Sequence, residues 1–180
     1  MRVRDDVTTE FFLDFDLFDG FEAAEIDALA EFTEYRVYEP GEHVVDEGDR
    51  SRDIFLLTDG RIEIRKADRE GEAKNLATLE PEAILGELGL VLGEPRSATA
   101  VAETEAHLLH IAGEPLLSRR RDGLIAAHKI EHNVLRSLAR RQSDMNARLM
   151  EAMGRLEESS APARDEVTEL RENLTENWSF

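Results

Sequence analysis

The feature that most constrains the fold is a run of short apolar segments between residues 35 and 112, separated by turn signals. Residues 61–65 read Arg-Ile-Glu-Ile-Arg and alternate polar and apolar side chains, as a half-buried β-strand does. The dipeptide Asp59-Gly60 predicts a tight hairpin, because such a turn needs positive φ. Many short strands at close spacing favour an antiparallel sandwich or barrel. The predicted strands are 35–38, 43–46, 54–58, 61–65, 75–79, 98–102 and 107–111.

The segments on both sides of this β region have helical periodicity. In residues 11–34 the apolar side chains recur at roughly helical spacing, which predicts a short helical zone. The pattern returns from about Glu114 and then carries a heptad seam with one polar position, Gln142. A seam of this kind favours packing against a second copy of the same helix. Its residues are Leu135, Leu138, Gln142, Met145, Leu149, Ala152 and Leu156.

Charge and composition exclude several classes of function. The 180 residues include 40 acidic and 22 basic side chains, so the formal net charge is −18. This charge argues against direct nucleic acid binding, which needs clustered Lys and Arg, and against anionic membranes. The absence of cysteine excludes disulfides and thiolate sites. No apolar run approaches the roughly 20 residues of a membrane span or forms a signal core, so we expect a cytoplasmic protein.

Residues 79–102 are the most informative for function, because they predict a short helix and a loop inserted between two strands. The start of a helix favours an anion, and Gly86 allows a ligand to approach the backbone closely. Arg96 has the planar guanidinium that binds phosphate oxygens through two hydrogen bonds. Glu87 is an odd neighbour for a phosphate alone, but it suits a ligand that also carries a hydroxyl. A ribose phosphate has both groups.

The order Gly-Glu-Leu at 86–88 followed by Arg-Ser-Ala at 96–98 resembles the phosphate-binding cassette of cyclic nucleotide-binding domains. Glycine-marked motifs between residues 40 and 60 match the first half of the β-roll of that family, and 124–156 resembles its long closing helix. The resemblance covers about residues 15–156. It implies an α+β fold, a jelly-roll-like antiparallel β-roll with short N-terminal helices and a long C-terminal helix.

The resemblance also implies a division of the chain. Residues 1–123 would form the β-roll domain with its N-terminal helices, 124–158 the long dimerisation or lid helix, and 159–180 an acidic tail. The stretch after Leu156 is acidic and contains Pro162, so no DNA-recognition helix fits there. We therefore expect a homodimeric sensor that acts on a downstream protein partner, which the sequence does not identify, rather than on DNA.

The roles that the resemblance implies for the cassette begin with the phosphate. Arg96 would pair with the cyclic phosphate, while Ser97 and the backbone N–H of Ala98 would add donors. Glu87 would accept a hydrogen bond from the ribose 2′-hydroxyl. A serine at position 97 is compatible with adenine, so cAMP is favoured over cGMP, and a cyclic dinucleotide stays open. We expect the nucleotide to be a ligand, with no cofactor, no metal, no catalytic residue and no enzymatic activity.

Further contacts are implied around the ribose and the base. Gly86 and Leu88 would supply backbone contacts, and Asn146 on the long helix would reach the base. The β-roll wall that bounds the base would consist of Val45, Leu56, Ile64 and Leu76.

Two positions depart from the family pattern. Glu82 replaces a glycine and Leu85 replaces a common aromatic residue. If that glycine has positive φ, the turn in this chain is strained or remodelled. The alternative function is therefore a ligand-free β-roll that serves as a protein-interaction scaffold, with Arg96 paired to a nearby carboxylate.

A second motif, His128-x-x-Glu131-His132, spells a zinc-peptidase pattern. That chemistry needs a third protein ligand and a large cleft for the peptide, and residues four apart share a helix face whether or not they bind metal. Short motifs often match by chance. We therefore predict no metal site at these histidines.

Overall fold

The computed structural model describes residues 2–4, 12, 14–68, 71–121 and 123–159. The chain divides into two units, residues 1–135 and residues 136–180. The first unit contains both sheets, the short helices and the beginning of the last helix, and the second contains the rest of that helix. The predicted acidic tail lies outside the described residues from position 160 onward.

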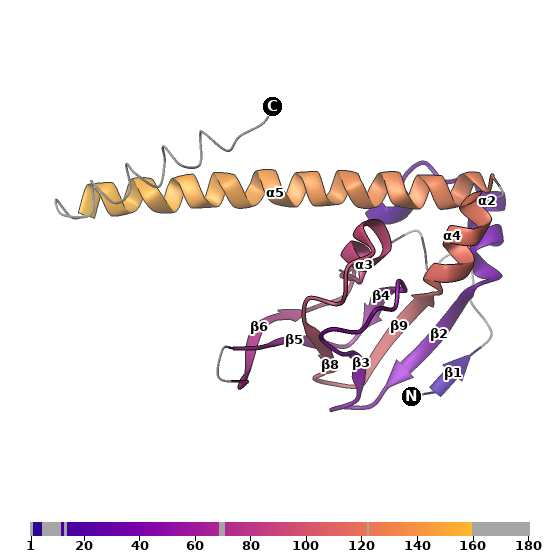
Figure 1. The fold of residues 1–180 in the computed structure, drawn as a ribbon, viewed down its shortest axis with the longest axis horizontal. Coiled ribbons are helices and arrows are strands. Elements are labelled where there is room, and N and C mark those ends of the chain that lie inside the picture. The colour runs from indigo at the N-terminus through magenta and orange to yellow at the C-terminus, as the bar shows by residue number, and fades with distance from the viewer. Residues whose placement is uncertain (1, 5–11, 13, 69–70, 122, 160–180) are drawn as a thin grey trace. The chain divides into compact units, whose positions relative to one another are not determined.

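Two antiparallel sheets form the first unit (Figure 1). One has the strand order β1-β2-β9-β4-β7 and the other has the order β3-β8-β5-β6. The predicted α+β fold, an antiparallel β-roll followed by a long C-terminal helix, is confirmed. The strands are β1 (Arg2–Arg4), β2 (Thr33–Tyr38), β3 (His43–Val45), β4 (Ile54–Asp59), β5 (Ile62–Ala67), β6 (Ala73–Leu79), β7 (Ile84–Leu85), β8 (Thr99–Ala102) and β9 (Ala106–Ile111).

Each predicted strand overlaps one observed strand, but the turn at Asp59-Gly60 is not the predicted hairpin. β4 and β5 belong to different sheets, and β5 pairs with β6 and β8. Gly60 does have positive φ, 86°, and a Cβ there would lie closer than 3.0 Å to the carbonyl oxygen of Glu105 in the crossover from β8 to β9. A dipeptide indicates a turn, whereas the partner of each strand depends on packing between the sheets.

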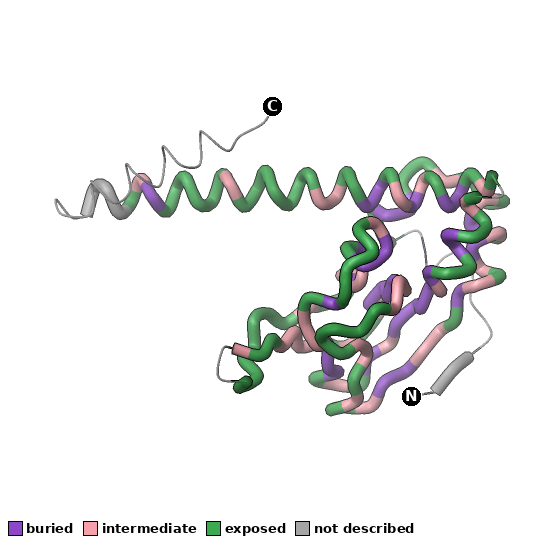
Figure 2. Tube along the Cα trace, viewed as in Figure 1, coloured by how far each residue is buried: buried purple, intermediate pink, exposed green. Residues whose placement is uncertain are grey.

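The first four residues of β4, Ile54 to Leu57, are all buried, and Figure 2 colours β4 mostly as buried. Phe55 and Leu57 join the cluster between the sheets, and Val45 and Ile64 pack against it. Leu56 is fully buried but is not a member of this cluster, and its place in the wall around the base stays a prediction. Leu76 lies on the outer strand β6 and is 60% exposed. The other members of the inner cluster are Tyr38, Ile62, Leu85, Ala100, Ala102, Ala106 and Leu108.

The helices of the first unit lie at the N-terminus, in the cassette and after β9. The start of α5 is tied to the N-terminal helices, because Asn133 donates from Nδ2 to the carbonyl oxygens of Leu17 (2.9 Å) and Asp19 (3.1 Å). Ile130 and Val134 on the same part of α5 are buried. The helical elements are η1 (Asp16–Phe18), α2 (Ala23–Ala30), α3 (Glu87–Leu92), α4 (Gly113–Arg121) and α5 (Ile125–Ser159).

In the second unit, α5 continues as a single helix that carries most of the predicted seam. Met145 is 65% exposed and Leu149 is 37% exposed. Two large apolar side chains four residues apart therefore share an open face of the helix. None of the described helices is long and apolar enough to cross a membrane.

Candidate functional site

The cassette, residues 86–98, is built around the close approach of Gly86 to Arg96. Gly86 precedes α3 with φ of 89°. A Cβ at this position would lie closer than 3.0 Å to both Nη1 of Arg96 and the carbonyl oxygen of Asp53. A glycine therefore meets both the conformational and the steric requirement, and its absent side chain leaves the space that the guanidinium occupies.

The Arg96 side chain is buried, with 6% exposure, and only part of it is hydrogen-bonded. Its Nη2 donates to Oγ of Ser51 (3.0 Å) and to the carbonyl oxygen of Asp53 (2.7 Å). Its Nε and Nη1 have no partner among the described residues. Leaving buried donors unpaired costs about 1–3 kcal/mol each, and more on a charged group. The arrangement therefore favours an acceptor that binds at Nε and Nη1.

The charges around Arg96 are mostly acidic. Burial lowers the pKa of the Arg96 guanidinium, and the carboxylates of Asp53, Asp49 and Glu87 oppose this shift. Arginine keeps its charge in proteins, so the site presents one buried cation among several carboxylates. An anion bound here must be held by directed hydrogen bonds, because the surrounding acidic charge repels it.

The structure brings three predicted site residues together: Gly86, Glu87 and Arg96. Glu87 is buried at the first position of α3, and its charge acts on Arg96. Leu88 is exposed on the same helix. Ser97, which is exposed, and Ala98, which is half-buried, follow Arg96 and lead into β8. Asn146 lies on α5 within the second unit, and its contact with the base stays a prediction.

Sequence reasoning missed the loop that holds Arg96 from the other side. We call residues 49–53 the bridge loop. The carbonyl oxygen of Asp49 accepts a hydrogen bond from the backbone N–H of Arg96 at 2.7 Å. Nη2 of Arg52 donates to the carbonyl oxygen of Leu90 in α3 at 2.9 Å. The only sequence signal for this loop is its position after the turn residue Gly48.

Asp53 in the bridge loop has a second set of partners. Its Oδ2 lies 2.8 Å from Nε2 of His110, and its Oδ1 accepts a hydrogen bond from the backbone N–H of Gly113 at 2.8 Å. Burial raises the pKa of the Asp53 carboxyl, but the hydrogen bonds from His110 and Gly113 outweigh burial, so the pKa lies below its ordinary value. The folded state therefore favours the ionised carboxylate.

This shift predicts an acid-sensitive component of stability. A carboxyl with a depressed folded pKa stabilises the fold above its ordinary pKa and loses that contribution as the pH falls through the folded value. We expect the free energy of unfolding of the wild type to fall more between about pH 5 and pH 3 than that of Asp53→Asn, measured by urea denaturation. The control is Glu114→Gln, which removes an exposed carboxylate on α4 and should retain the wild-type pH dependence of stability. If the free energy of unfolding fell equally with pH in the wild type and in Asp53→Asn, the lowered pKa of the Asp53 carboxyl would be contradicted.

The strained turn predicted at Glu82 is present. Glu82 has φ of 73°, and it is the only residue other than glycine with positive φ in the described part of the chain. Its backbone N–H donates to the carbonyl oxygen of Leu57 at 2.9 Å, which holds the turn against β4. Glu82 therefore adopts the left-handed backbone conformation that glycine adopts most easily, although it has a Cβ.

Glu82→Gly should stabilise the protein. Relief of left-handed strain contributes about 1–2 kcal/mol, and the greater entropy of unfolded glycine offsets about 0.5–1 kcal/mol. We expect a net gain of about 0.5–1 kcal/mol in the free energy of unfolding, measured by urea denaturation. Glu80→Gly, in the same turn but without positive φ, should lose stability instead. A loss in both variants would show that Glu82 carries no strain.

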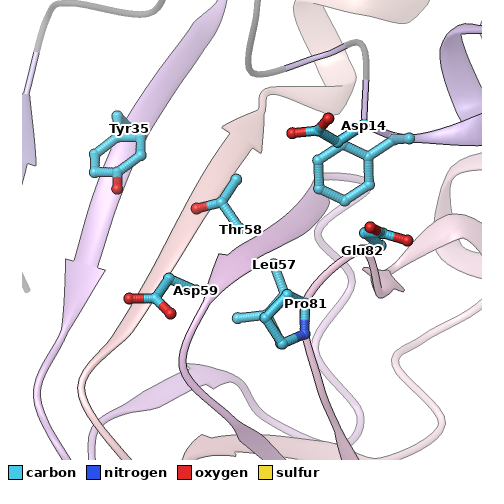
Figure 3. A pocket seen from close by; sticks show the side chains of 8 residues that line it. Asp14, Tyr35, Leu57, Thr58, Asp59, Pro81 and Glu82 are labelled. Carbon is cyan, nitrogen blue, oxygen red and sulfur yellow. The ribbon is translucent and has the colours of Figure 1, made fainter.

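A pocket of about 330 Å³ lies elsewhere on the first unit (Figure 3). No cassette residue lines it, and three of its lining side chains are carboxylates. Such a pocket repels a phosphate, so it is a poorer candidate for an anion site than the surroundings of Arg96. The lining residues are Asp14, Phe15, Tyr35, Leu57, Thr58, Asp59, Pro81 and Glu82.

The zinc-peptidase pattern on α5 does not form a recognisable metal site. Glu131 makes an ion pair with Arg120 on α4. His128 and His132 are both exposed. Within the described ranges, no group of three or more His, Cys, Asp or Glu side chains is arranged to hold a metal ion.

Comparison with known families bears on the cassette directly. Residues 35–120 match the family model described as the cyclic nucleotide-binding domain. The matched range includes the bridge loop and the whole cassette. Residues 35–120 belong to the cyclic nucleotide-binding domain family.

Two of the curated relatives are named as a receptor protein and as a kinase regulatory subunit. The cyclic AMP receptor protein of Thermus thermophilus is 31% identical over 134 residues, which are 74% of this chain and 60% of that protein. A cAMP-dependent protein kinase regulatory subunit of Mycosarcoma maydis is 34% identical over 93 residues, 52% of this chain and 18% of that protein. The chain thus spans less than two thirds of either relative.

The fold agrees with that of a solved relative. The crystal structure of the Thermus thermophilus catabolite activator protein matches with a TM-score of 0.60 and 29% identity. The match covers 77% of this chain and 64% of that one. The observed architecture is therefore that of cyclic nucleotide-binding domains.

Proposed function

We propose that this protein is a regulatory sensor that binds a cyclic nucleotide monophosphate in the cassette and signals through α5. The observation that carries the proposal is the buried guanidinium of Arg96, whose Nε and Nη1 lack partners among the described residues. A cyclic phosphate is an anion with several acceptor oxygens, and it supplies what these donors need. The carboxylates near Arg96 in the described part of the chain do not form hydrogen bonds with its Nε or Nη1. This argues against the ligand-free alternative, in which Arg96 pairs with a nearby carboxylate.

The other cassette residues have complementary roles in this proposal. Ser97 and the backbone N–H of Ala98 donate to the phosphate beside Arg96. Glu87 accepts from the ribose 2′-hydroxyl, and a carboxylate so close to an anion site suits a ligand that carries both groups. The backbone at Gly86 and Leu88 contacts the sugar phosphate. Asn146 on α5 contacts the base.

The favoured ligand is cAMP, with cGMP and a cyclic dinucleotide as competitors. The relatives from Thermus thermophilus and Mycosarcoma maydis are both named for cAMP, which supports this choice. The protein acts as a regulator and not as an enzyme, and the nucleotide is a signal rather than a cofactor. Its action is cytoplasmic, without direct contact to nucleic acid or membrane, and it passes the signal to a protein partner.

Isothermal titration calorimetry tests the proposal. We expect saturable heat with cAMP, a weaker response with cGMP, and none with 5′-AMP, whose extra phosphate charge meets the surrounding carboxylates. Cyclic dinucleotides are titrated in parallel. No heat with any of these cyclic ligands at millimolar concentration, at several salt concentrations, would overturn the proposal and favour the scaffold function.

The proposal also includes a homodimer formed through the helix at 124–158. The support is the exposed pair Met145 and Leu149 on α5, which lies on the heptad seam. Burial of such side chains against a second copy contributes about 1.5–3 kcal/mol for each one.

Leu149→Lys should therefore weaken the dimer by at least about tenfold in dissociation constant, since it places a charge in an apolar seam. Sedimentation velocity over a concentration series measures the change. Ala147→Lys adds the same charge to an exposed position off the seam and should leave the dimer intact. Equal effects of the two variants would exclude this seam as the interface.

The strained turn at Glu82 is the observation that favours a second function, the ligand-free scaffold. A family glycine has been lost there while its backbone conformation persists. A scaffold would show no nucleotide binding, and its α5 would retain the dimer seam unchanged.

A further inference from the structure

The bridge loop contacts the cassette with its backbone and side chains. Oγ of Ser51 and the carbonyl oxygen of Asp53 both accept from Nη2 of Arg96. Arg52 reaches in the same direction and donates to the carbonyl oxygen of Leu90 near the end of α3. The loop therefore holds the guanidinium at one end and leaves Nε and Nη1 for an anion.

The same loop contacts the start of α4. The carboxylate of Asp53 accepts from the N–H of Gly113. The carbonyl oxygen of Arg52 packs so closely on Gly113 that a Cβ there would lie within 3.0 Å of it. Asp53 thus holds Arg96 with its backbone oxygen and α4 with its side chain, and any shift of this residue changes both contacts.

His110 holds the carboxylate of Asp53 from the centre of the sheet. It lies on β9, which pairs with β2 on one side and β4 on the other. His110 is 5% exposed, and the centroid of its ring lies 5.0 Å from that of Phe55. An ionised carboxylate only accepts hydrogen bonds, so Nε2 of His110 is the donor to Asp53. Nδ1 has no hydrogen-bond partner in the described residues, and the nearest carboxylate oxygen recorded for it is Oε2 of Glu34 at 3.8 Å.

We propose that Asp53, fixed by His110, is the positioning residue for Arg96 and the link through which anion binding in the cassette reaches the start of α4. The inference rests on the proposed function for the nature of the anion. An anion at Nε and Nη1 pulls the guanidinium against its anchor on the carbonyl oxygen of Asp53. The carboxylate of Asp53 also accepts from the N–H of Gly113, so the position of the Asp53 backbone is coupled to the first turn of α4. This coupling is reciprocal: anion binding affects α4, and changes in α4 affect the affinity for the anion.

Hydrogen exchange of the full chain, followed by mass spectrometry with and without saturating cAMP, tests the link. In the wild type, cAMP should slow exchange in both 86–98 and 113–121. In His110→Leu the dissociation constant should rise about tenfold, and at saturation 86–98 should be protected while 113–121 is not.

Two matched variants separate this role from general packing. His110→Gln keeps an N–H donor near the position of Nε2 and should restore protection of 113–121. His110→Asn has the same amide group on a shorter side chain that does not reach Asp53, so it should behave as His110→Leu does. This variant replaces His110→Leu in the test if the leucine variant does not fold. His107→Leu makes the same substitution on the opposite face of β9. It should retain the wild-type dissociation constant and the wild-type protection of 113–121.

A double-mutant cycle without ligand makes the inference independent of cAMP. Arg96→Lys should speed exchange of 113–121 in the wild-type background and have little further effect in the His110→Asn background. Additive effects of the two substitutions on 113–121 would overturn the link. An absence of cAMP protection at 86–98 in the wild type would instead contradict the proposed ligand, so the two failures are distinguishable.

Discussion

Replacing Arg96 with lysine should lower the affinity for the proposed cyclic nucleotide by at least about a hundredfold, because the two unpaired donors disappear from the site. Lysine keeps the positive charge but has neither Nε–H nor Nη1–H in the planar arrangement of the guanidinium. Each hydrogen bond to a charged group contributes about 1.5–3 kcal/mol, so the loss of two is enough for this effect. Isothermal titration calorimetry with cAMP measures it.

The matched control is Arg61→Lys, which changes an exposed arginine paired with Glu103 on the surface. Its affinity for cAMP should equal that of the wild type. Circular dichroism should show that Arg96→Lys is folded, since its neighbours in the cassette are retained. Unchanged binding by folded Arg96→Lys would remove Arg96 from the site, and with it the central argument for an anion.

Gly86→Ala should abolish binding and destabilise the fold by about 3 kcal/mol, the second large effect that the structure predicts. The added Cβ falls on Nη1 of Arg96 and on the carbonyl oxygen of Asp53, and the backbone oxygen cannot move aside without disturbing the bridge loop. The left-handed backbone adds about 1–2 kcal/mol of strain for any residue with a Cβ. Urea denaturation and cAMP titration measure the two losses.

Gly93→Ala provides the comparison. Gly93 also has positive φ, 69°, but an added Cβ there meets only the guanidinium end of Arg52, at 3.2 Å. A flexible side chain can move aside, so this variant should lose only about 1–2 kcal/mol of stability and retain cAMP binding. If Gly86→Ala behaved in the same way, the steric role of Gly86 would be refuted and only its conformational role would stand.

The parts of the site that were predictable are those that are local in sequence. The cassette brings Gly86, Glu87 and Arg96 within a short segment, and the spacing of a helix and a loop already places them near one another. The strands were predictable for the same reason, because alternation and turn dipeptides act over a few residues. The strain at Glu82 followed from one substitution in a known pattern, and the φ of 73° confirms it.

The parts that were not predictable depend on contacts between distant segments. Asp53 and His110 are 57 residues apart, and neither stands out in a chain with 40 acidic residues and 5 histidines. Asp59-Gly60 indicates a turn, but nothing within it indicates that β5 leaves the first sheet for the second. The four consecutive buried residues at the start of β4 show no alternation in their sequence, so the sequence alone does not indicate which of them join the cluster between the sheets.

The acidic surroundings of Arg96 have a kinetic consequence. The carboxylates of Asp53, Asp49 and Glu87 act on the guanidinium at short range, and the chain as a whole carries a formal charge of −18. Under the proposed function, an incoming anionic nucleotide is therefore repelled at long range and held only by short-range hydrogen bonds in the cassette. At an ionic strength of about 0.1 M, salt screens the repulsion beyond about 10 Å but hardly affects buried hydrogen bonds. Added salt should therefore accelerate capture of the nucleotide and leave the lifetime of the complex nearly unchanged.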